Sequence, residues 1–326
     1  MQDTIEKLTV YGKGILAADE STPTIEKRLA SVGIDSTPGT RHSYRHTLFS
    51  TDGLENYISG VILYDETLRH FMDGESAFTP LIDKGITLGI KVDKGAKPYS
   101  DGGKLTEGLD GLTERLREYK DLGAEFAKWR AVINIGDSGS CILANAWHLA
   151  RYAKKCQLEN VVPIVEPEVI MDGTHTIDDS IRITERVLHH VFDAMFYEKV
   201  KLEHMILKPN MILHGYNHAV SINNDEVADM TVSSLRRAVP AAVPMIAFLS
   251  GGQIDGEAVK NLNAINQYCR PPWYMSFSFG RELQQNALKL WAEGKREDAQ
   301  DALLKRANQC SLATQGELHG TTNLSV

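Results

Sequence analysis

One lysine of this sequence lies where an ammonium group is unexpected. Lys208 is in the middle of HMILKPNMI, residues 204–212, and apolar residues flank it on both sides. Lysine is rarely buried without a partner, because an apolar environment disfavours its charged form. A neighbouring cation disfavours that form further, and Lys128 is a candidate for such a neighbour. An uncharged lysine forms a Schiff base with a carbonyl compound, and the iminium allows an adjacent carbon–carbon bond to break or form.

Charged residues also recur in pairs inside other apolar runs. The pairs are Lys91/Asp93, Lys128/Arg130 and Glu166/Glu168. Side chains two residues apart on a strand share a face, and buried charges need partners. Separate solvated charges at loop edges are the alternative, but acids and bases occur here in similar number. We therefore expect these residues to meet Lys208 in one polar site.

Two glycine-containing stretches predict an anion site. LSGGQ (249–253) and SFSFGRE (276–282) each follow an apolar run. Glycine lets backbone N–H groups approach a phosphate closely, and helix N-termini favour anions. Arg281 would add a charge-assisted contact. A tight strand-to-helix turn explains either stretch alone, but two in consecutive units favour a phosphate site.

Short apolar runs alternate with amphipathic stretches about eight times. The predicted strands cover 14–19, 60–65, 86–93, 125–133, 161–169, 204–212, 244–251 and 274–280. Helical spacing of apolar residues marks 141–156, 178–196, 231–239 and 282–294. Such alternation implies parallel strands with right-handed crossovers, and eight units form a closed (β/α)8 barrel. A doubly wound open sheet is the alternative, but no G-x-G-x-x-G follows the first run.

The predicted fold class is therefore α/β, a single-domain (β/α)8 TIM barrel over residues 1–326 with an extended C-terminal tail from about residue 311. In such barrels the reactive residues lie at the C-terminal ends of the strands, and the loops after strands seven and eight often hold a phosphate. The charged pairs, Lys208 and both glycine stretches occupy those positions, and Asp19 ends the first predicted strand.

Composition limits the remaining classes. The net charge of −8 argues against a nucleic-acid partner. The longest apolar run, 238–249, is too short for a membrane span and has two prolines. Four cysteines without a C-x-x-C motif are typical of reduced thiols, so we expect a cytoplasmic protein. No H-E-x-x-H spacing occurs, and His214 and His218 are expected to be structural or exposed rather than metal ligands.

The sequence resembles class I fructose-bisphosphate aldolase over nearly its whole length, in the family's order. The matching stretches are GKGILAADEST (12–22), GIKVDKG (89–95), GLDGLTERLREYKDLGAEFAKWRAV (108–132), VPIVEPE (162–168), LKPNM (207–211), FLSGGQ (248–253), NLNAIN (261–266) and FGR (279–281). The resemblance implies a cytoplasmic homotetramer of glycolysis and gluconeogenesis that needs no metal or other cofactor. It would cleave fructose 1,6-bisphosphate reversibly to dihydroxyacetone phosphate and glyceraldehyde 3-phosphate.

The resemblance also implies a role for each matching residue. Lys208 would be the Schiff-base lysine and Glu166 the acid/base, while Glu168 and Lys128 would orient and polarise this centre. Asp19 would take the C4 hydroxyl proton as the bond breaks. One phosphate would be held by Ser250, Gly251, Gly252, Ser278, Gly280 and Arg281. The sugar chain or the other phosphate would be met by Ser21, Arg28, Lys91 and Arg130.

Two departures from the family pattern stand out. Thr24, after Pro23, replaces a frequent serine of the strand-one loop but keeps a hydroxyl. The tail ends at Val326 without the tyrosine that in many eukaryotic members assists proton exchange. Three alternatives remain at this point: a Schiff-base aldolase that prefers another phosphorylated ketose, a metal-dependent enzyme, and a non-catalytic barrel scaffold.

Overall fold

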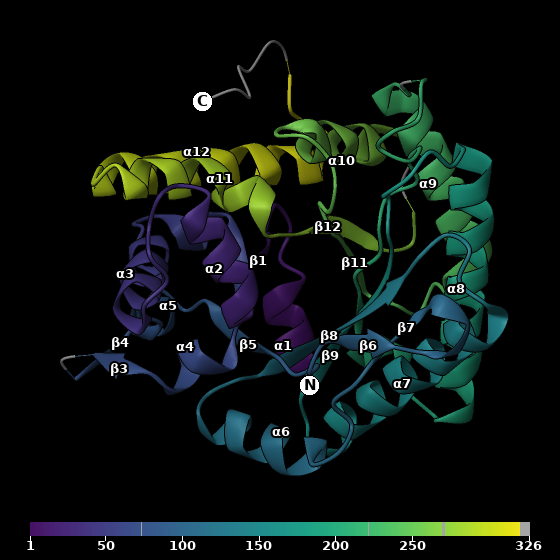
Figure 1. The fold of residues 1–326 in the computed structure, drawn as a ribbon, viewed down its shortest axis with the longest axis horizontal. Coiled ribbons are helices and arrows are strands. Elements are labelled where there is room, and N and C mark those ends of the chain that lie inside the picture. Colours follow the sequence, from purple (N-terminus) through teal and green to yellow (C-terminus); the bar gives the residue numbers. More distant parts are fainter. Residues whose placement is uncertain (73, 221, 269–270, 320–326) are drawn as a thin grey trace.

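The computed structural model describes residues 1–72, 74–220, 222–268 and 271–319. Eight parallel strands close into a barrel in which each strand pairs with the next barrel strand along the chain (Figure 1). Around the barrel they are β1 (Gly14–Ala18), β2 (Ile58–Leu63), β5 (Thr87–Lys91), β8 (Phe126–Ile133), β9 (Val162–Val169), β10 (Ile206–Leu207), β11 (Met245–Phe248) and β12 (Tyr274–Phe279). The predicted single-domain (β/α)8 barrel is confirmed.

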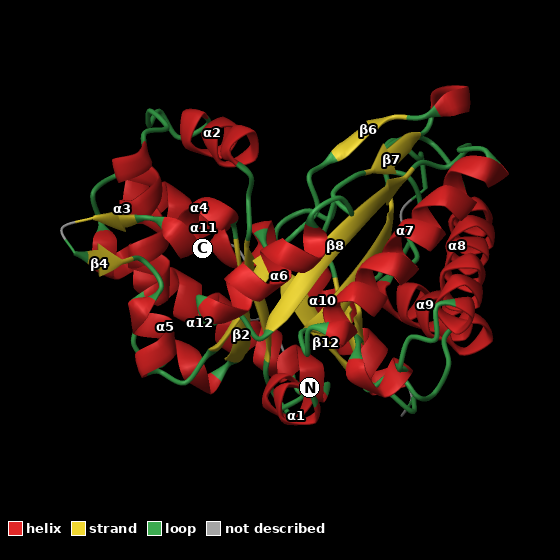
Figure 2. Cartoon of the chain, turned by 90° about the horizontal axis from the view of Figure 1, so that it is seen from below, coloured by secondary structure: helices red, strands yellow, loops and turns green. Residues whose placement is uncertain are grey.

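The helices surround the strands, and two short hairpins extend from the loops (Figures 1 and 2). The helices are α1 (Gln2–Leu8), α2 (Thr22–Ala30), α3 (Pro38–Phe49), α4 (Asp65–Arg69), α5 (Thr79–Asp83), α6 (Leu112–Asp121), α7 (Gly139–Leu158), α8 (Ile177–Tyr197), α9 (Asn224–Ala238), α10 (Glu257–Tyr268), α11 (Arg281–Ala292) and α12 (Arg296–Gln315). The hairpins are β3–β4 (Phe71–Met72 with Glu75–Ser76) and β6–β7 (Ala96–Pro98 with Lys104–Thr106).

Apolar side chains fill the end of the barrel that α1 covers, so among the described residues the opposite end is the one open to a ligand. Ile5 and Leu8 of α1 pack into an interior cluster with Ile15, Phe126 and other strand residues. Figure 2 shows α1 at the end opposite α2 and the β6–β7 hairpin. Because α1 covers this end, the polar groups at the carboxyl ends of the strands face the only mouth that the described elements leave open.

Two glycines make room for a large ring in the barrel interior. Gly89 of β5 is the direct neighbour of Phe126 on β8, whose side chain is fully buried. A methyl group on Gly89 would lie 2.1 Å from the Phe126 ring, and one on Gly60 would lie 2.6 Å from Leu8. Protein interiors are close-packed, so neither position tolerates an added carbon without displacement of its neighbour.

The predicted strand at 204–212 is the main correction to the sequence analysis. Only Ile206–Leu207 forms a strand, and Lys208 is the first residue beyond it. Pro209 has no N–H to donate, so the strand ladder cannot continue through it. The Lys208 N–H still donates to the Val165 carbonyl at 2.8 Å, which holds the lysine against β9. The lysine is thus buried at a strand end rather than inside a core strand.

Two helix boundaries also differ from the prediction. α9 begins at Asn224, seven residues before the predicted start, because a capping box joins Asn223 and Glu226. The extended tail was predicted from about residue 311, whereas α12 continues to Gln315, where Gly316 ends it in a left-handed conformation. Ser311 and Thr314 are buried, so the last turn of α12 belongs to the packed domain. Residues 320–326 lie outside the described ranges.

We expect Gly89→Ala to lower the free energy of unfolding by about 2 kcal/mol, because the added methyl group overpacks Phe126. Chemical denaturation measures the change. The double variant Gly89→Ala/Phe126→Leu is the control, since the smaller side chain leaves space for the methyl group and should recover part of the loss. Additive effects of the two substitutions would contradict this packing.

Candidate active site

The open end of the barrel holds a cavity of about 860 Å³, a volume suited to a small-molecule ligand. Most of the residues singled out from the sequence line it. They are Asp19, Ser21, Arg28, Lys91, Lys128, Arg130, Glu166, Glu168, Lys208, Ser250, Gly251, Ser278, Gly280 and Arg281. Gly252 belongs to the same loop as Gly251 but does not line the cavity. The barrel thus brings together residues that are separated by more than two hundred positions in the sequence.

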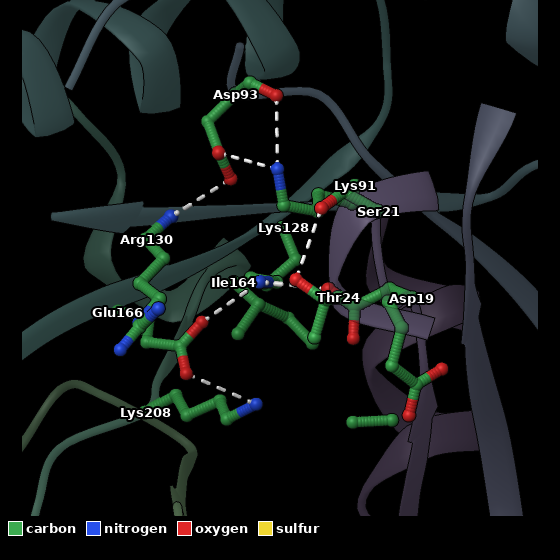
Figure 3. Close-up of polar contacts among 12 residues, drawn as sticks. Asp19, Ser21, Thr24, Lys91, Asp93, Lys128, Arg130, Ile164, Glu166 and Lys208 are labelled. Atoms are coloured by element: carbon green, nitrogen blue, oxygen red, sulfur yellow. Dashed lines mark hydrogen bonds and ion pairs between the residues drawn. The ribbon is translucent and has the colours of Figure 1, made fainter. Parts of the chain in front are cut away.

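Two lysines and two carboxylates alternate at the centre of the site (Figure 3). Lys128 Nζ lies 2.8 Å from Asp19 Oδ2 and 3.0 Å from Glu166 Oε2. Lys208 Nζ lies 3.1 Å from the other oxygen of Glu166. β8 is not a neighbour of β1, so Lys128 reaches across the mouth of the barrel to Asp19.

The charges of these four alternating side chains stabilise one another. Burial favours the neutral form of Asp19, yet Lys128 and Lys208 outweigh it and lower the pKa of Asp19 to about 2. Burial likewise opposes ionisation of Glu166, but Lys128, Lys208 and Arg130 lower its pKa. Burial disfavours the ammonium of Lys128, while the surrounding carboxylates raise its pKa well above the ordinary value. Asp19 and Glu166 are therefore ionised near neutral pH, and both can accept a proton.

Glu166 retains capacity for a further partner. Its Oε2 atom is buried and faces Lys128, but it accepts no aligned hydrogen bond from the described residues. Buried carboxylate oxygens normally find such a bond, so an unused acceptor that lines a cavity indicates a place for ligand or proton. The arrangement suits proton exchange with a group bound to Lys208.

A second layer of ion pairs surrounds the centre. Lys91 Nζ lies 2.5 Å from Asp93 Oδ1, and Asp93 Oδ2 accepts from the Arg130 N–H at 3.3 Å. Arg130 also pairs with Glu168. The predicted same-face pair Lys91/Asp93 is thus a direct ion pair. Lys128 and Arg130 instead pair with Glu166 and Glu168 of the neighbouring strand β9, and Lys128 also pairs with Asp19. Glu168 holds Arg130 rather than Lys208.

The segment that carries Asp19 is held from behind by residues that the sequence analysis did not identify. Gln284 Nε2 donates to the Ala17 carbonyl at 2.7 Å and to Glu20 Oε1 at 3.2 Å, and Tyr44 donates to Gln284 at 3.1 Å. Arg45 donates to the Glu20 carbonyl at 3.0 Å. These contacts join helices that are distant in sequence, so no local pattern could have revealed them.

One face of α2 adds another polar wall to the cavity. Its lining residues are Thr24, Lys27, Arg28 and Ser31. They follow the i, i+3, i+4, i+7 spacing of one helix face, so a search for polar helical stripes would have found Lys27 and Ser31. Lys104, Asn134 and Asp172 also line the cavity and were missed, because each lies in a loop or hairpin with no periodic pattern.

The predicted anion site has the features that phosphate binding requires. Gly280 is the N-cap of α11 and has no side chain with which to cap the helix, which leaves N–H groups available at the helix start. The Ser278 hydroxyl is buried, lines the cavity and has no hydrogen-bond partner among the described residues. Together with Arg281 these groups form a site that favours a phosphate.

A buried acid anchors the loop of this anion site. Glu282 accepts from the Gly256 N–H at 3.0 Å and pairs with Arg306 of α12, which also lies 3.2 Å from Asp255. Burial raises the pKa of Glu282 to about 7, because the attraction of Arg306 is partly cancelled by the nearby charge of Asp255. The loop that carries Ser250 and Gly251 is therefore tied to α11 and α12 at its far end.

His214 and His218 contact each other at the end of the segment that follows Lys208. The rings of His214 and His218 stack with centroids 4.1 Å apart, and both side chains are partly exposed. Across the described ranges, no group of three or more His, Cys, Asp or Glu side chains is arranged to hold a metal ion. Burial and the neighbouring His218 lower the pKa of His214. The structural or exposed role expected for these residues agrees with this geometry.

We expect the pH dependence of stability to reveal Glu282. Its carboxyl keeps a proton in the native state up to about pH 7, whereas an unfolded glutamate loses it near 4.5. The native protein should therefore lose stability as the pH rises between these values, by roughly 2–3 kcal/mol. Glu282→Gln removes the titration, so its melting temperature should vary less between about pH 5 and about pH 8. Identical pH slopes for the two proteins would contradict this assignment.

We also expect Lys128→Met to destabilise the fold more than Lys208→Met. Without Lys128, Asp19 and Glu166 lose their shared cation, and an unpaired buried charge costs about 3–5 kcal/mol. Without Lys208, Glu166 still has Lys128. Urea denaturation compares the two variants, with the exposed Lys260→Met as control. Equal losses for both variants would show that Lys128 is not the central cation.

Comparisons with known proteins agree with this architecture. Residues 1–325 match the family Fructose-bisphosphate aldolase class-I. A probable fructose-bisphosphate aldolase class 1 of Xylella fastidiosa is 48% identical, over 98% of each chain. Fructose-bisphosphate aldolase 2 of Plasmodium berghei is 47% identical, over 98% of this chain and 89% of the relative.

A solved structure is also similar. It contains fructose-bisphosphate aldolase from Plasmodium falciparum in complex with TRAP and a small-molecule inhibitor. The TM-score is 0.95 at 45% identity, and the match covers 98% of this chain and 95% of the other. With a family match over almost every residue and a shared barrel, the chain belongs to the class I fructose-bisphosphate aldolase family.

Proposed function

We propose that this protein cleaves fructose 1,6-bisphosphate reversibly to dihydroxyacetone phosphate and glyceraldehyde 3-phosphate through a Schiff base on Lys208. The observation that carries the proposal is the buried chain Asp19–Lys128–Glu166–Lys208, in which a lysine with a proton acceptor at 3.1 Å faces a cavity. Membership of the family supports the same chemistry.

Formation of the Schiff base begins with proton transfer from Lys208 to Glu166. Sequence reasoning expected an apolar pocket to deprotonate the lysine, whereas the nearby carboxylate supplies a direct acceptor. The free amine attacks the C2 carbonyl, and Glu166 returns its proton to the carbinolamine oxygen, which leaves as water. Lys128 stabilises the carboxylate form of Glu166 before it takes the first proton and after it has returned it.

Cleavage then uses the second carboxylate. Asp19 takes the proton of the C4 hydroxyl as the C3–C4 bond breaks, and the bond electrons move through C3 and C2 to the iminium nitrogen. The aldehyde product leaves, and an enamine remains on Lys208. A proton added at C3 restores the iminium, and water releases the ketone product. A pKa of about 2 keeps Asp19 ionised and ready to accept the proton.

The two phosphates of the substrate fit opposite parts of the mouth. C1 is bonded to C2, so its phosphate lies near Lys208 and meets the loop after β11, which is the next strand after β10. The cavity-lining groups proposed to hold it are Ser250, Gly251, Ser278, Gly280 and Arg281, with Gly252 in the same loop. The sugar chain and the C6 phosphate are then met by Ser21, Arg28, Lys91 and Arg130. Glu168 acts through Arg130, with which it pairs.

We further propose a cytoplasmic homotetramer that acts in glycolysis and gluconeogenesis without a metal or other cofactor. Cys156 and Cys310 are buried, and burial raises the pKa of both thiols, which agrees with inert, reduced cysteines. Phe196 and Tyr197 are exposed large apolar side chains, which suits contact with further subunits. No helix in the described ranges is long and apolar enough to cross a membrane.

We expect Lys208→Met to lower cleavage of fructose 1,6-bisphosphate by about three orders of magnitude or more, because no Schiff base can form. Borohydride with substrate should inactivate the parent protein by reducing the Schiff base, and EDTA should not inhibit it. A coupled assay measures cleavage, and mass spectrometry locates the reduced adduct. Lys260→Met serves as the control, since this lysine is exposed on α10.

The outcomes of this experiment separate the alternatives. Unchanged cleavage by Lys208→Met would disprove the Schiff-base mechanism, and loss of activity in EDTA without borohydride trapping would indicate a metal-dependent enzyme. A parent protein without any cleavage would favour a scaffold. The same assay with fructose 1-phosphate and sedoheptulose 1,7-bisphosphate tests the preference among phosphorylated ketoses, and we expect fructose 1,6-bisphosphate to be the best substrate.

A further inference from the structure

The cations that line the cavity divide into two groups. Lys91, Lys128, Arg130, Lys208 and Arg28 all pair with carboxylates inside the site. Three further cations line the cavity without an ion pair to any carboxylate of the described residues. They are Lys27, Lys104 and Arg281. Their charge is not neutralised by the protein, so it is available to an anionic ligand even though the chain carries a net charge of −8.

Lys104 belongs to a hairpin whose two faces differ. In the β6–β7 pairing, Ala96 is opposite Thr106, and Ala96, Lys104 and Thr106 all line the cavity. Alternate residues of a strand point to opposite faces, so Lys97 and Glu107 occupy the outer face. Their side chains form an ion pair of 2.6 Å there, and neither residue lines the cavity. The hairpin therefore directs one lysine inward and keeps the other neutralised outside.

Two side chains of α7, one of them buried, hold this hairpin in place. Asn145 is 1% exposed, donates to the Lys104 carbonyl at 2.8 Å and accepts from the Thr106 N–H at 3.2 Å. His148 Nδ1 lies 2.9 Å from the Thr106 carbonyl. A buried amide is tolerated only because it makes such bonds. The backbone of Lys104 is thus fixed before any ligand arrives, and only its side chain must become ordered on binding.

The hairpin and the loop after β11 are on opposite sides of the barrel. The hairpin follows β5, and β5 is four strands from β11 in either direction around the ring of eight. The hairpin consequently lies across the mouth from the loop that carries Ser250 and Gly251. Figure 2 shows the β6–β7 hairpin and α2 on either side of this end of the barrel. A ligand with one phosphate at the β11 loop extends its other end towards Lys104.

We propose that Lys104 binds the substrate phosphate that is remote from the Schiff base, and so favours bisphosphorylated over monophosphorylated ketoses. This inference rests on the proposed function. An ammonium group is a flexible point charge that can follow a phosphate at the rim of a site, whereas the inner arginines are held by Glu168 and Glu20. Lys104 adds a contact that costs little reorganisation of the protein.

The test compares Lys104→Met with Lys97→Met, a matched lysine on the outer face of the same hairpin. A coupled assay measures kcat/KM for fructose 1,6-bisphosphate and for fructose 1-phosphate, which lacks the remote phosphate. We expect Lys104→Met to lower the ratio of the two values about fivefold at low salt, mainly through KM, and less at about 0.15 M salt because exposed charges are screened. Lys97→Met should leave the ratio unchanged, and Lys104→Arg should keep the ratio close to that of the parent protein.

Each result has a defined meaning. An unchanged ratio in Lys104→Met, or an equal fall in Lys97→Met, overturns the assignment, since the first shows no contact and the second shows only a general effect of charge. A parallel loss for both substrates also overturns it. Failure of the proposed function is seen separately, as absence of cleavage and of borohydride trapping in the parent protein. Melting temperatures confirm that the surface variants remain folded.

Discussion

The arrangement of the site depends on the attraction between Lys128 and the two carboxylates on either side of it. An isolated buried charge is very unfavourable, so Asp19, Glu166, Lys128 and Lys208 are stable only as a set. That mutual dependence keeps both carboxylates ionised where a carbonyl compound would react. It also places a proton acceptor 3.1 Å from Lys208, the proposed nucleophile.

The rest of the barrel restricts where these charges can lie. At the closed end, α1 and the Phe126 ring fill the interior, and Gly60 and Gly89 provide the space that they need. At the open end, contacts between distant helices fix the loops, as Gln284 does for the strand-one segment and Arg306 for the β11 loop. The residues of the ion pairs that span the mouth are therefore held by a rigid backbone, which lowers the entropic cost of orienting the reacting groups.

This protein is acidic overall, so an anionic ligand needs cations at the mouth of the barrel that the protein's own carboxylates do not neutralise. Most cations of the cavity pair with its carboxylates, whereas Lys27, Lys104 and Arg281 have no ion pair with a carboxylate of the described residues. Lys27 comes from α2, Arg281 from α11 and Lys104 from the β6–β7 hairpin, and Figure 2 shows α2 and the hairpin on opposite sides of this end of the barrel. That distribution suits a ligand with an anionic group at each end.

The sequence by itself determined the barrel class and predicted the charged residues at the centre of the cavity, with Lys208 as the proposed Schiff-base lysine, because parallel strands place their carboxyl ends at one edge and residue types indicate the chemistry. Only the tertiary structure decided that Lys128 reaches across to Asp19, that Glu168 pairs with Arg130, and that the strand before Lys208 has just two residues. It also decided that Lys104 lies on the face of the β6–β7 hairpin that lines the cavity. These features depend on contacts between segments distant in the chain, and periodicity reports only local geometry.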